Sequence, residues 1–158
     1  MSDVDAAAAF SDDEQRALAC VLDLLIPSSN DGRMPGAGEL GLAVHIDRIA
    51  QREPGLRAAV AAGVAALDEL ARRRGAAGFT ALAGPDRLAV LKEVAAAQPG
   101  FLPGLIFHTY VGYYQEGRVL EGLGLDPRPP FPTGHALEPF DAALLEPTRQ
   151  RGKLYRDA

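Results

Sequence analysis

The sequence predicts an all-α fold: a bundle of about five helices followed by a long, extended, proline-rich C-terminal arm. Between residues 11 and 114, apolar side chains recur at spacings of three and four, the period of helices that cover a core on one side. Alternating runs rich in β-branched residues, which strands need, do not occur. From Gly117 onward glycines and prolines become frequent, and such residues interrupt regular elements.

Two signals set the ends of the first helix. Ser11 and Glu14 form an S-x-x-E capping box, and Pro27 is incompatible with a continuing helix. Between them lie the apolar residues expected to face the core: Leu18, Val21, Leu22 and Leu25. The composition of the next eight residues, SSNDGRMP, predicts a loop.

The second and third helices are predicted at residues 39–52 and 54–74. In the second, one face is apolar, whereas three polar residues are expected to turn away from the core: Asp47, Arg48 and Gln51. Pro54 ends this helix and opens the next, in which arginines cluster in the last turn. Gly75 is suited to a left-handed C-terminal cap.

The fourth helix is predicted to begin near Pro85, with three residues facing inward: Leu88, Leu91 and Val94. The fifth covers residues 101–114 and contains three of the four tyrosines. Because it is the most apolar and aromatic segment, we expect it to be the central helix.

The composition divides the chain into three parts: a flexible N-terminus (residues 1–10), a helical domain (11–124) and an extended C-terminal arm (125–158). The arm contains six of the twelve prolines and one plausible short helix, at residues 140–145. Its large apolar side chains are too few to offset the conformational entropy lost on ordering it. We therefore expect the arm to lie on another surface, either that of a partner or that of its own helices.

Composition also limits the function. A length of 158 residues suits one domain, and a net charge of -5 disfavours nucleic acid as a partner. The single Cys20 excludes an internal disulfide and is expected to be a small buried side chain. Apolar runs are too short for direct membrane insertion, and the absence of a secretory signal predicts a cytoplasmic protein.

No motif for catalysis, cofactor binding or metal binding stands out. The segment 36–41 matches G-x-G-x-x-G, but a polar loop precedes it where a dinucleotide fold has a strand, so the glycines are expected to let a loop turn closely into the second helix. The three histidines lie far apart and form no zinc motif. We therefore predict no catalytic, cofactor or metal residue on this chain.

Two groups of residues favour binding of a protein partner. The first is the aromatic helix, because tyrosine tolerates a half-hydrated interface; its candidates are His108, Tyr110, Tyr113 and Tyr114. The second is the arm, whose end is basic on an acidic protein; its candidates are Phe131, His135, Arg149, Arg151 and Tyr155.

Taken in order, several segments resemble the gluconate 2-dehydrogenase subunit 3 family. They are LLIP at residues 24–27, PGAGELGLAVHID at 35–47, FTALAGPDRLAVL at 79–91, HTYVGYY at 108–114, PPFPTGH at 129–135 and LLEPTRQRGKLYR at 144–156. The resemblance implies a non-catalytic small subunit that stabilises a large FAD-dependent sugar or polyol oxidoreductase of the glucose-methanol-choline type. It also implies that FAD and the catalytic base belong to the large subunit. Many relatives carry a twin-arginine signal, which this sequence lacks.

Two alternatives stay open at the level of sequence. One is a stand-alone helical enzyme or ligand-binding bundle that uses His108 and nearby tyrosines in a pocket. The other is a homodimeric scaffold in which the arms are exchanged.

Overall fold

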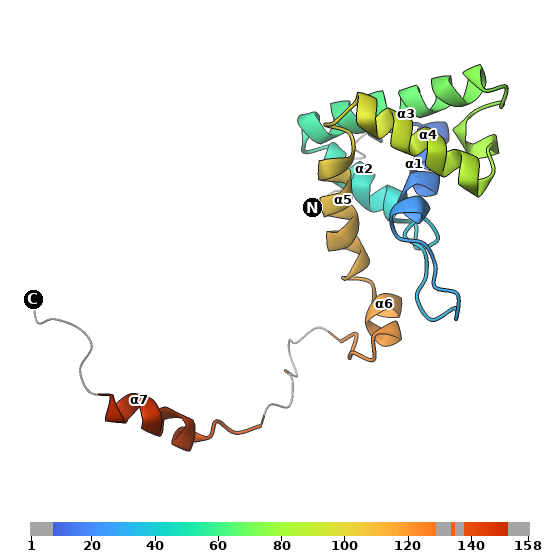
Figure 1. The fold of residues 1–158 in the computed structure, drawn as a ribbon. Helices are drawn as coiled ribbons and strands as arrows, with labels where there is room; N and C mark the ends of the chain where they lie inside the picture. The colour runs from blue at the N-terminus through green and yellow to red at the C-terminus, as the bar shows by residue number, and fades with distance from the viewer. Residues whose placement is uncertain (1–7, 129–133, 135–137, 152–158) are drawn as a thin grey trace, which may run out of the picture. The chain divides into compact units, whose positions relative to one another are not determined.

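The computed structural model describes residues 8–128, 134 and 138–151, and these residues are all-helical (Figure 1). The elements are α1 (Asp12–Leu25), α2 (Leu42–Ala50), α3 (Pro54–Arg73), η1 (Phe79–Ala81), α4 (Gly84–Ala97), α5 (Leu102–Tyr113), α6 (Gly117–Gly122), η2 (Ala142–Leu145) and α7 (Glu146–Gln150), where η denotes a 3-10 helix. The chain forms two compact units, here called the body (Met1–Pro127) and the C-terminal unit (Arg128–Ala158). The predicted all-α class is confirmed for the described residues.

The body is built around α3. This helix packs against α1, α2, η1, α4 and α5, and Figure 1 shows it beside α4 across the top of the body. The main contacts of α5 are with α2 and α3, so the prediction that the aromatic helix is central is wrong. Length explains the difference, because α3 has 20 residues and buries apolar side chains along its whole extent.

Helix α1 begins as predicted, with both halves of the capping box formed between Ser11 and Glu14. Just before it, Phe10 is buried, and its backbone N–H donates to Asp47 Oδ1 at 2.9 Å. Asp47 Oδ2 also accepts a hydrogen bond from Gln51 Nε2 at 2.8 Å. Asp47 is therefore buried, and the prediction that it turns away from the core is wrong because it satisfies a buried backbone donor.

The glycine-rich loop between α1 and α2 packs closely on α1. Asp23 Oδ1 accepts hydrogen bonds from the backbone N–H groups of Gly38 and Glu39, at 2.7 and 3.2 Å. A Cβ on Gly38 would overlap the carbonyl oxygen of Ala19. The expectation that these glycines permit a close loop is confirmed, although α2 starts at Leu42, after the left-handed Gly41, and not at residue 39.

Helices α4 and α5 differ in how completely they are covered. On α4 the buried residues are Val90, Leu91 and Val94, whereas Leu88 is 39% exposed and the prediction that it faces inward is wrong. The main contact of α4 is with α3 alone, which leaves the remaining sides of α4 open. At the start of α5, the buried ring of Phe101 packs directly on the α-carbon of Gly63 in α3.

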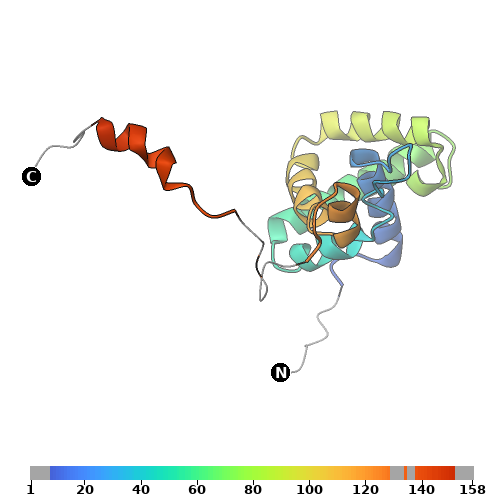
Figure 2. The same cartoon turned by 90° about the horizontal axis from the view of Figure 1, so that it is seen from below.

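The body continues past α5 into α6, a helix that the glycine content did not predict. Val119 of α6 is buried, and Arg33 donates a hydrogen bond to the carbonyl of Gly122. Helix α6 thus lies against the loop that joins α1 to α2, as seen from below in Figure 2. A few buried contacts suffice to form one turn and a half of helix where glycines alone predict none.

The described part of the C-terminal unit consists of η2 and α7, preceded by Asp141, whose side chain caps η2 through the N–H of Ala143. The helix predicted at residues 140–145 is present as η2, and α7 extends it. Neither element buries a residue. The predicted extended form of the arm is not confirmed, because residues 129–133, 135–137 and 152–158 lie outside the described residues.

Candidate interaction surface

The outer side of α5 carries a continuous set of exposed apolar and aromatic side chains, here called the α5 stripe. Its members are Phe107, Tyr110, Val111 and Tyr114, which are 62%, 45%, 38% and 50% exposed. The spacing i, i+3, i+4 and i+7 places them along one side of the helix. Helix α2, which packs against α5, has one exposed large apolar residue of its own, Val44.

The aromatic rings of the α5 stripe are already arranged against one another. Tyr110 and Tyr114 stack with their ring centroids 6.1 Å apart, and Phe107 meets His108 edge-on at 5.0 Å. Tyrosine and phenylalanine are enriched at protein interfaces, and a contiguous exposed apolar set indicates a contact surface. The α5 stripe is therefore the strongest candidate for a protein-binding surface in the described residues.

Tyr113 does not belong to this surface. Its side chain is 2% exposed, and its hydroxyl donates to the carbonyl oxygen of Pro35 at 2.8 Å. Burial, followed by the nearby Tyr114 and Glu39, raises the pKa of the Tyr113 hydroxyl. Tyr113 thus joins α5 to the α1–α2 loop, and only two of the three predicted tyrosines are available at the surface.

A pocket of about 350 Å³ lies beside the α5 stripe, between α2, the α2–α3 turn and α5; it is here called the α2–α5 pocket. It is lined by His45, Arg48, Ile49, Arg52, Glu53 and His108. His108 Nε2 lies 3.5 Å from Glu53 Oε2, the only carboxylate in the lining. Tyr110, Tyr113 and Tyr114, the tyrosines that the structure describes, do not line this pocket, so the alternative in which His108 acts together with them loses its geometric support.

His45 lies at the inner wall of the pocket. Its Nε2 is buried without a hydrogen-bond partner, and its ring packs on Gly112 so closely that a Cβ there would lie 2.8 Å from Cδ2. Burial, and then the electrostatic effects of Arg48 and His108, lower the pKa of His45. His45 is therefore neutral at pH 7 and fills the contact between α2 and α5.

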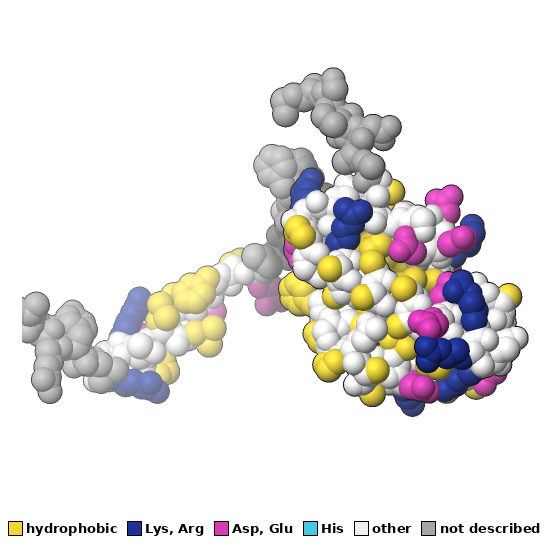
Figure 3. Space-filling model, turned by 90° about the horizontal axis from the view of Figure 1, so that it is seen from above, with side chains coloured by type: hydrophobic (Ala, Val, Ile, Leu, Met, Phe, Trp, Pro, Cys, Tyr) yellow, Lys and Arg dark blue, Asp and Glu magenta, His cyan; other side chains and the backbone are white. Residues whose placement is uncertain are grey.

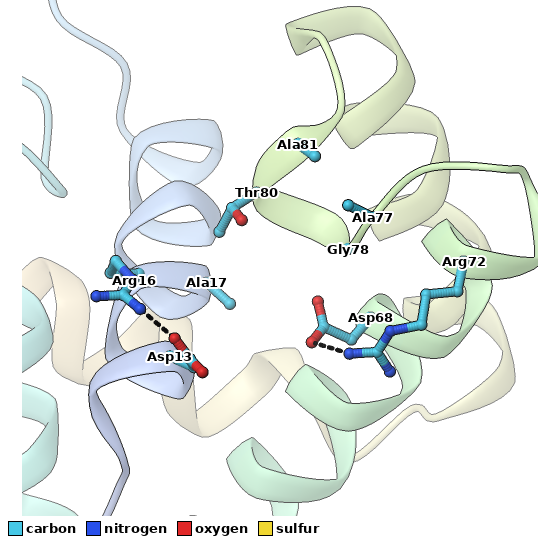
Figure 4. A pocket seen from close by; sticks show the side chains of 9 residues that line it. All are labelled: Asp13, Arg16, Ala17, Asp68, Arg72, Ala77, Gly78, Thr80 and Ala81. Carbon is cyan, nitrogen blue, oxygen red and sulfur yellow. Dashed lines mark hydrogen bonds and ion pairs between the residues drawn. The ribbon is translucent and has the colours of Figure 1, made fainter.

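A second pocket, of about 250 Å³, lies between α1, α3 and η1 (Figure 4). Its charged side chains are paired, Asp13 with Arg16 and Asp68 with Arg72. Asp68 Oδ1 also accepts the backbone N–H of Phe79 at 2.8 Å and so fixes the start of η1. The charged groups of this pocket are thus already paired within the chain, and Asp68 in addition holds the backbone of η1.

The structure brings together part of the predicted partner-binding set. His108, Tyr110 and Tyr114 share α5, and Arg149 and Arg151 are exposed in the C-terminal unit, where Arg149 lies 3.6 Å from Glu146. Phe131, His135 and Tyr155 lie outside the described residues. Sequence reasoning missed Phe107 and Val111, although their spacing of three from Tyr110 and Tyr114 carried the signal.

Two other kinds of site are absent from the described residues. Among the described side chains, no group of three or more His, Cys, Asp or Glu residues is placed to hold a metal ion. None of the helices described has the length and apolar content that crossing a bilayer requires.

A family model described as gluconate 2-dehydrogenase subunit 3 matches residues 12–119. The chain belongs to this family. The resemblance seen in the sequence is thereby confirmed, and the match includes α1 to α5 and hence both the α5 stripe and the α2–α5 pocket. The C-terminal unit of this family member lies beyond the matched residues. No curated protein and no solved structure shows significant similarity to the chain.

Proposed function

We propose that this chain is the non-catalytic small subunit of an oxidoreductase, and that it binds and stabilises a large FAD-dependent subunit of the glucose-methanol-choline type that acts on a sugar or polyol. The observation that carries the proposal is the α5 stripe, an exposed aromatic surface on a member of a family of dehydrogenase subunits. In this proposal FAD and the reacting groups belong to the partner. The location of this chain in the cytoplasm stays a prediction.

The α5 stripe suits the centre of such an interface. Stable interfaces bury about 800 Å² on each partner, with aromatic residues at the centre and a polar rim around them. Four large side chains on α5 supply the centre, and the charged residues of the α2–α5 pocket supply part of the rim. Removing these side chains from water favours the complex at about 25 cal/mol per Å² of apolar surface.

Stabilisation of the partner follows from mass action. A chain that binds the folded large subunit and not its unfolded form stabilises it by about 2.7 kcal/mol when its free concentration is one hundred times the Kd. A gain of that size is a substantial fraction of the net stability of most domains, which is about 5–15 kcal/mol. A small subunit therefore changes the yield of the folded large subunit without contributing to the reaction.

Co-expression tests this proposal. The large flavoprotein subunit of the same organism is produced alone, with this chain, and with the variant Phe107→Asp/Tyr110→Asp, and soluble protein and bound flavin are measured. Both substituted side chains are exposed, so we expect the variant chain to fold normally. We expect a several-fold higher yield of soluble, flavin-loaded large subunit with the unsubstituted chain than with the variant or with no small subunit. The control is Leu88→Asp, which introduces one negative charge at an exposed apolar position on α4.

Equal yield and flavin content without this chain would contradict the stabilising role. A complex that tolerates the double substitution as well as it tolerates Leu88→Asp would show that the α5 stripe is not the contact. Purification of the two chains together, followed by light scattering, gives the stoichiometry directly.

The α2–α5 pocket favours one other candidate function, a ligand-binding bundle that works alone. Its lining contains His108 and encloses about 350 Å³, enough for a small polar molecule. In that case the isolated chain is a stable monomer whose Tm rises with a bound metabolite. The homodimeric scaffold predicts instead a concentration-dependent dimer, and light scattering of the isolated chain separates the two.

A further inference from the structure

The arginines of the body differ in whether they have a partner. Most donate to a carboxylate or a carbonyl; these are Arg16, Arg33, Arg72, Arg73, Arg74, Arg87 and Arg118. Three do not form an ion pair or side-chain hydrogen bond with any described residue: Arg48, Arg52 and Arg57. These three follow one another along the chain, from α2 across the turn into α3, so the unpaired arginines are concentrated at one corner of the body.

This concentration contrasts with the rest of the charged surface. Figure 3 views the body from above, on the side of α3 and α4, and over part of that face basic and acidic side chains lie next to one another. At the α2–α5 pocket, by contrast, Arg48 and Arg52 line the wall with two histidines and a single carboxylate, that of Glu53. The pocket is thus a positively charged hollow on a protein whose net charge is -5.

The pocket is continuous with the α5 stripe. His108 lines the pocket, and its ring contacts Phe107 of the stripe edge-on, with centroids 5.0 Å apart. A partner that covers the stripe would therefore also cover the mouth of the pocket and exclude water from it. In a site with less water, an unpaired arginine is costly unless the partner supplies a negative charge.

We propose that the α2–α5 pocket binds an Asp or Glu side chain of the large subunit, with the guanidinium groups of Arg48 and Arg52 donating hydrogen bonds to its carboxylate oxygens. This inference rests on the proposed function and adds to it the chemistry of the contact. Arginine suits the task because its planar group presents paired donors that match the two oxygens of a carboxylate. The aromatic α5 stripe then packs against apolar residues beside that acidic residue.

The charged groups around the pocket are compatible with this role. Glu53 Oε2 lies 3.5 Å from His108 Nε2 and forms no ion pair with Arg48 or Arg52, so a bound carboxylate would not have to displace it from these arginines. Arg57 lies one turn into α3 and adds positive charge at the same corner. Charge complementarity of this kind raises the rate of association and fixes the orientation of the partners.

The test measures binding between the full chain and the purified large subunit at several salt concentrations. The variant Arg48→Glu/Arg52→Glu reverses the pocket arginines, and Arg16→Glu/Arg73→Glu reverses two paired, exposed arginines with the same change in net charge. We expect the pocket variant to raise the Kd roughly 30-fold or more. We expect the control to change the Kd by less than about threefold, since exposed ion pairs contribute little. The variant Arg48→Lys/Arg52→Lys keeps the charge without the paired donors, and we expect it to retain part of the affinity.

Three outcomes would count against the inference. If the pocket variant binds like its control while Phe107→Asp/Tyr110→Asp does not bind, the contact is apolar only, and the proposed function stands without this inference. The salt dependence is measured on the two unsubstituted chains, so it tests the inference even if a variant fails to fold. If the Kd of that pair does not rise with salt, the carboxylate contact is absent. If the two unsubstituted chains form no complex, both the proposed function and this inference are overturned.

Discussion

The body and the C-terminal unit use the same kinds of side chain to opposite effect. In the body, Phe79 and Phe101 are buried, whereas in the C-terminal unit Phe140 and Leu144 are 69% and 71% exposed. The body surrounds its aromatic residues with helices as long as the 20 residues of α3. The C-terminal unit has only η2 and α7 in its described part, and isolated helices shorter than about 12 residues are marginal in water. Hydrophobic content alone therefore does not make a core.

The largest effect is expected from a matched pair of phenylalanines. Phe101→Ala should lower the free energy of unfolding by about 3–5 kcal/mol, because it opens a cavity where the ring now packs on Gly63. Phe140→Ala should change it by less than about 0.5 kcal/mol, because that ring is exposed. Urea unfolding of the isolated chain, followed by circular dichroism, measures both.

The variants Phe101→Ala and Phe140→Ala test whether the two units differ in their contribution to stability. A loss of more than about 1 kcal/mol for Phe140→Ala would mean that the C-terminal unit contributes to the stability of the isolated chain. Phe107→Ala is a useful third variant, because its ring lies on the body but is 62% exposed, and we expect it to behave like Phe140→Ala.

An intermediate effect is expected at Asp47, the buried carboxylate of α2. Asp47→Ala leaves the buried N–H of Phe10 and the amide of Gln51 without their acceptor, which should cost about 1–3 kcal/mol. Asp47→Asn keeps an acceptor oxygen and should cost less. Thermal unfolding ranks the two variants against Asp13→Ala, an exposed carboxylate whose removal we expect to leave Tm unchanged. Equal effects at positions 13 and 47 would refute the structural role of Asp47.

A smaller effect, visible only with pH, is expected at His45. Burial and neighbouring cations lower the pKa of His45 in the folded body below its ordinary value of 6.5. Below pH 6.5, therefore, His45 is protonated in the unfolded chain before it is protonated in the folded chain. The free energy of unfolding then falls as the pH is lowered, and it levels off below the folded-state pKa. His45→Leu should remove this component. Urea unfolding of both proteins between pH 7.5 and 5.0 tests it, and parallel curves would contradict it.

The sequence could predict those parts of the fold that local chemistry determines. The capping box at Ser11, Pro54 as the start of α3 and the left-handed Gly75 depend on neighbouring residues, and each is present in the structure. By contrast, Asp47 and Leu88 are set by which helix lies opposite, and periodicity within one helix does not reveal that. Helix α6 was missed because its stability comes from Val119 and from contacts with a loop distant in sequence.

Part of the candidate site could likewise be predicted from the sequence, and part of it is evident only in the folded structure. The aromatic content of α5 was evident, but only the structure separates the buried Tyr113 from Tyr110 and Tyr114. The α2–α5 pocket could not be predicted, since His45 and His108 are far apart in sequence and meet only because α2 packs on α5. Whether an arginine is paired is likewise a property of the folded surface, so the cluster at Arg48 and Arg52 has no signature in the sequence.

The smallest effect on stability is expected from removal of the C-terminal unit, which tests directly whether this unit and the body are independent. A chain that ends at Pro127 should keep the free energy of unfolding of the full chain to within about 0.5 kcal/mol, because η2 and α7 bury no residue. Its m value in urea should also be unchanged, since m follows the surface exposed on unfolding and the described part of the C-terminal unit is exposed already. A lower m value in the shortened chain would show that the residues from Arg128 onward bury surface in the isolated protein. If stability and m are unchanged but the Kd for the large subunit rises, the C-terminal unit acts as a second attachment to the partner, joined to the first through the chain itself.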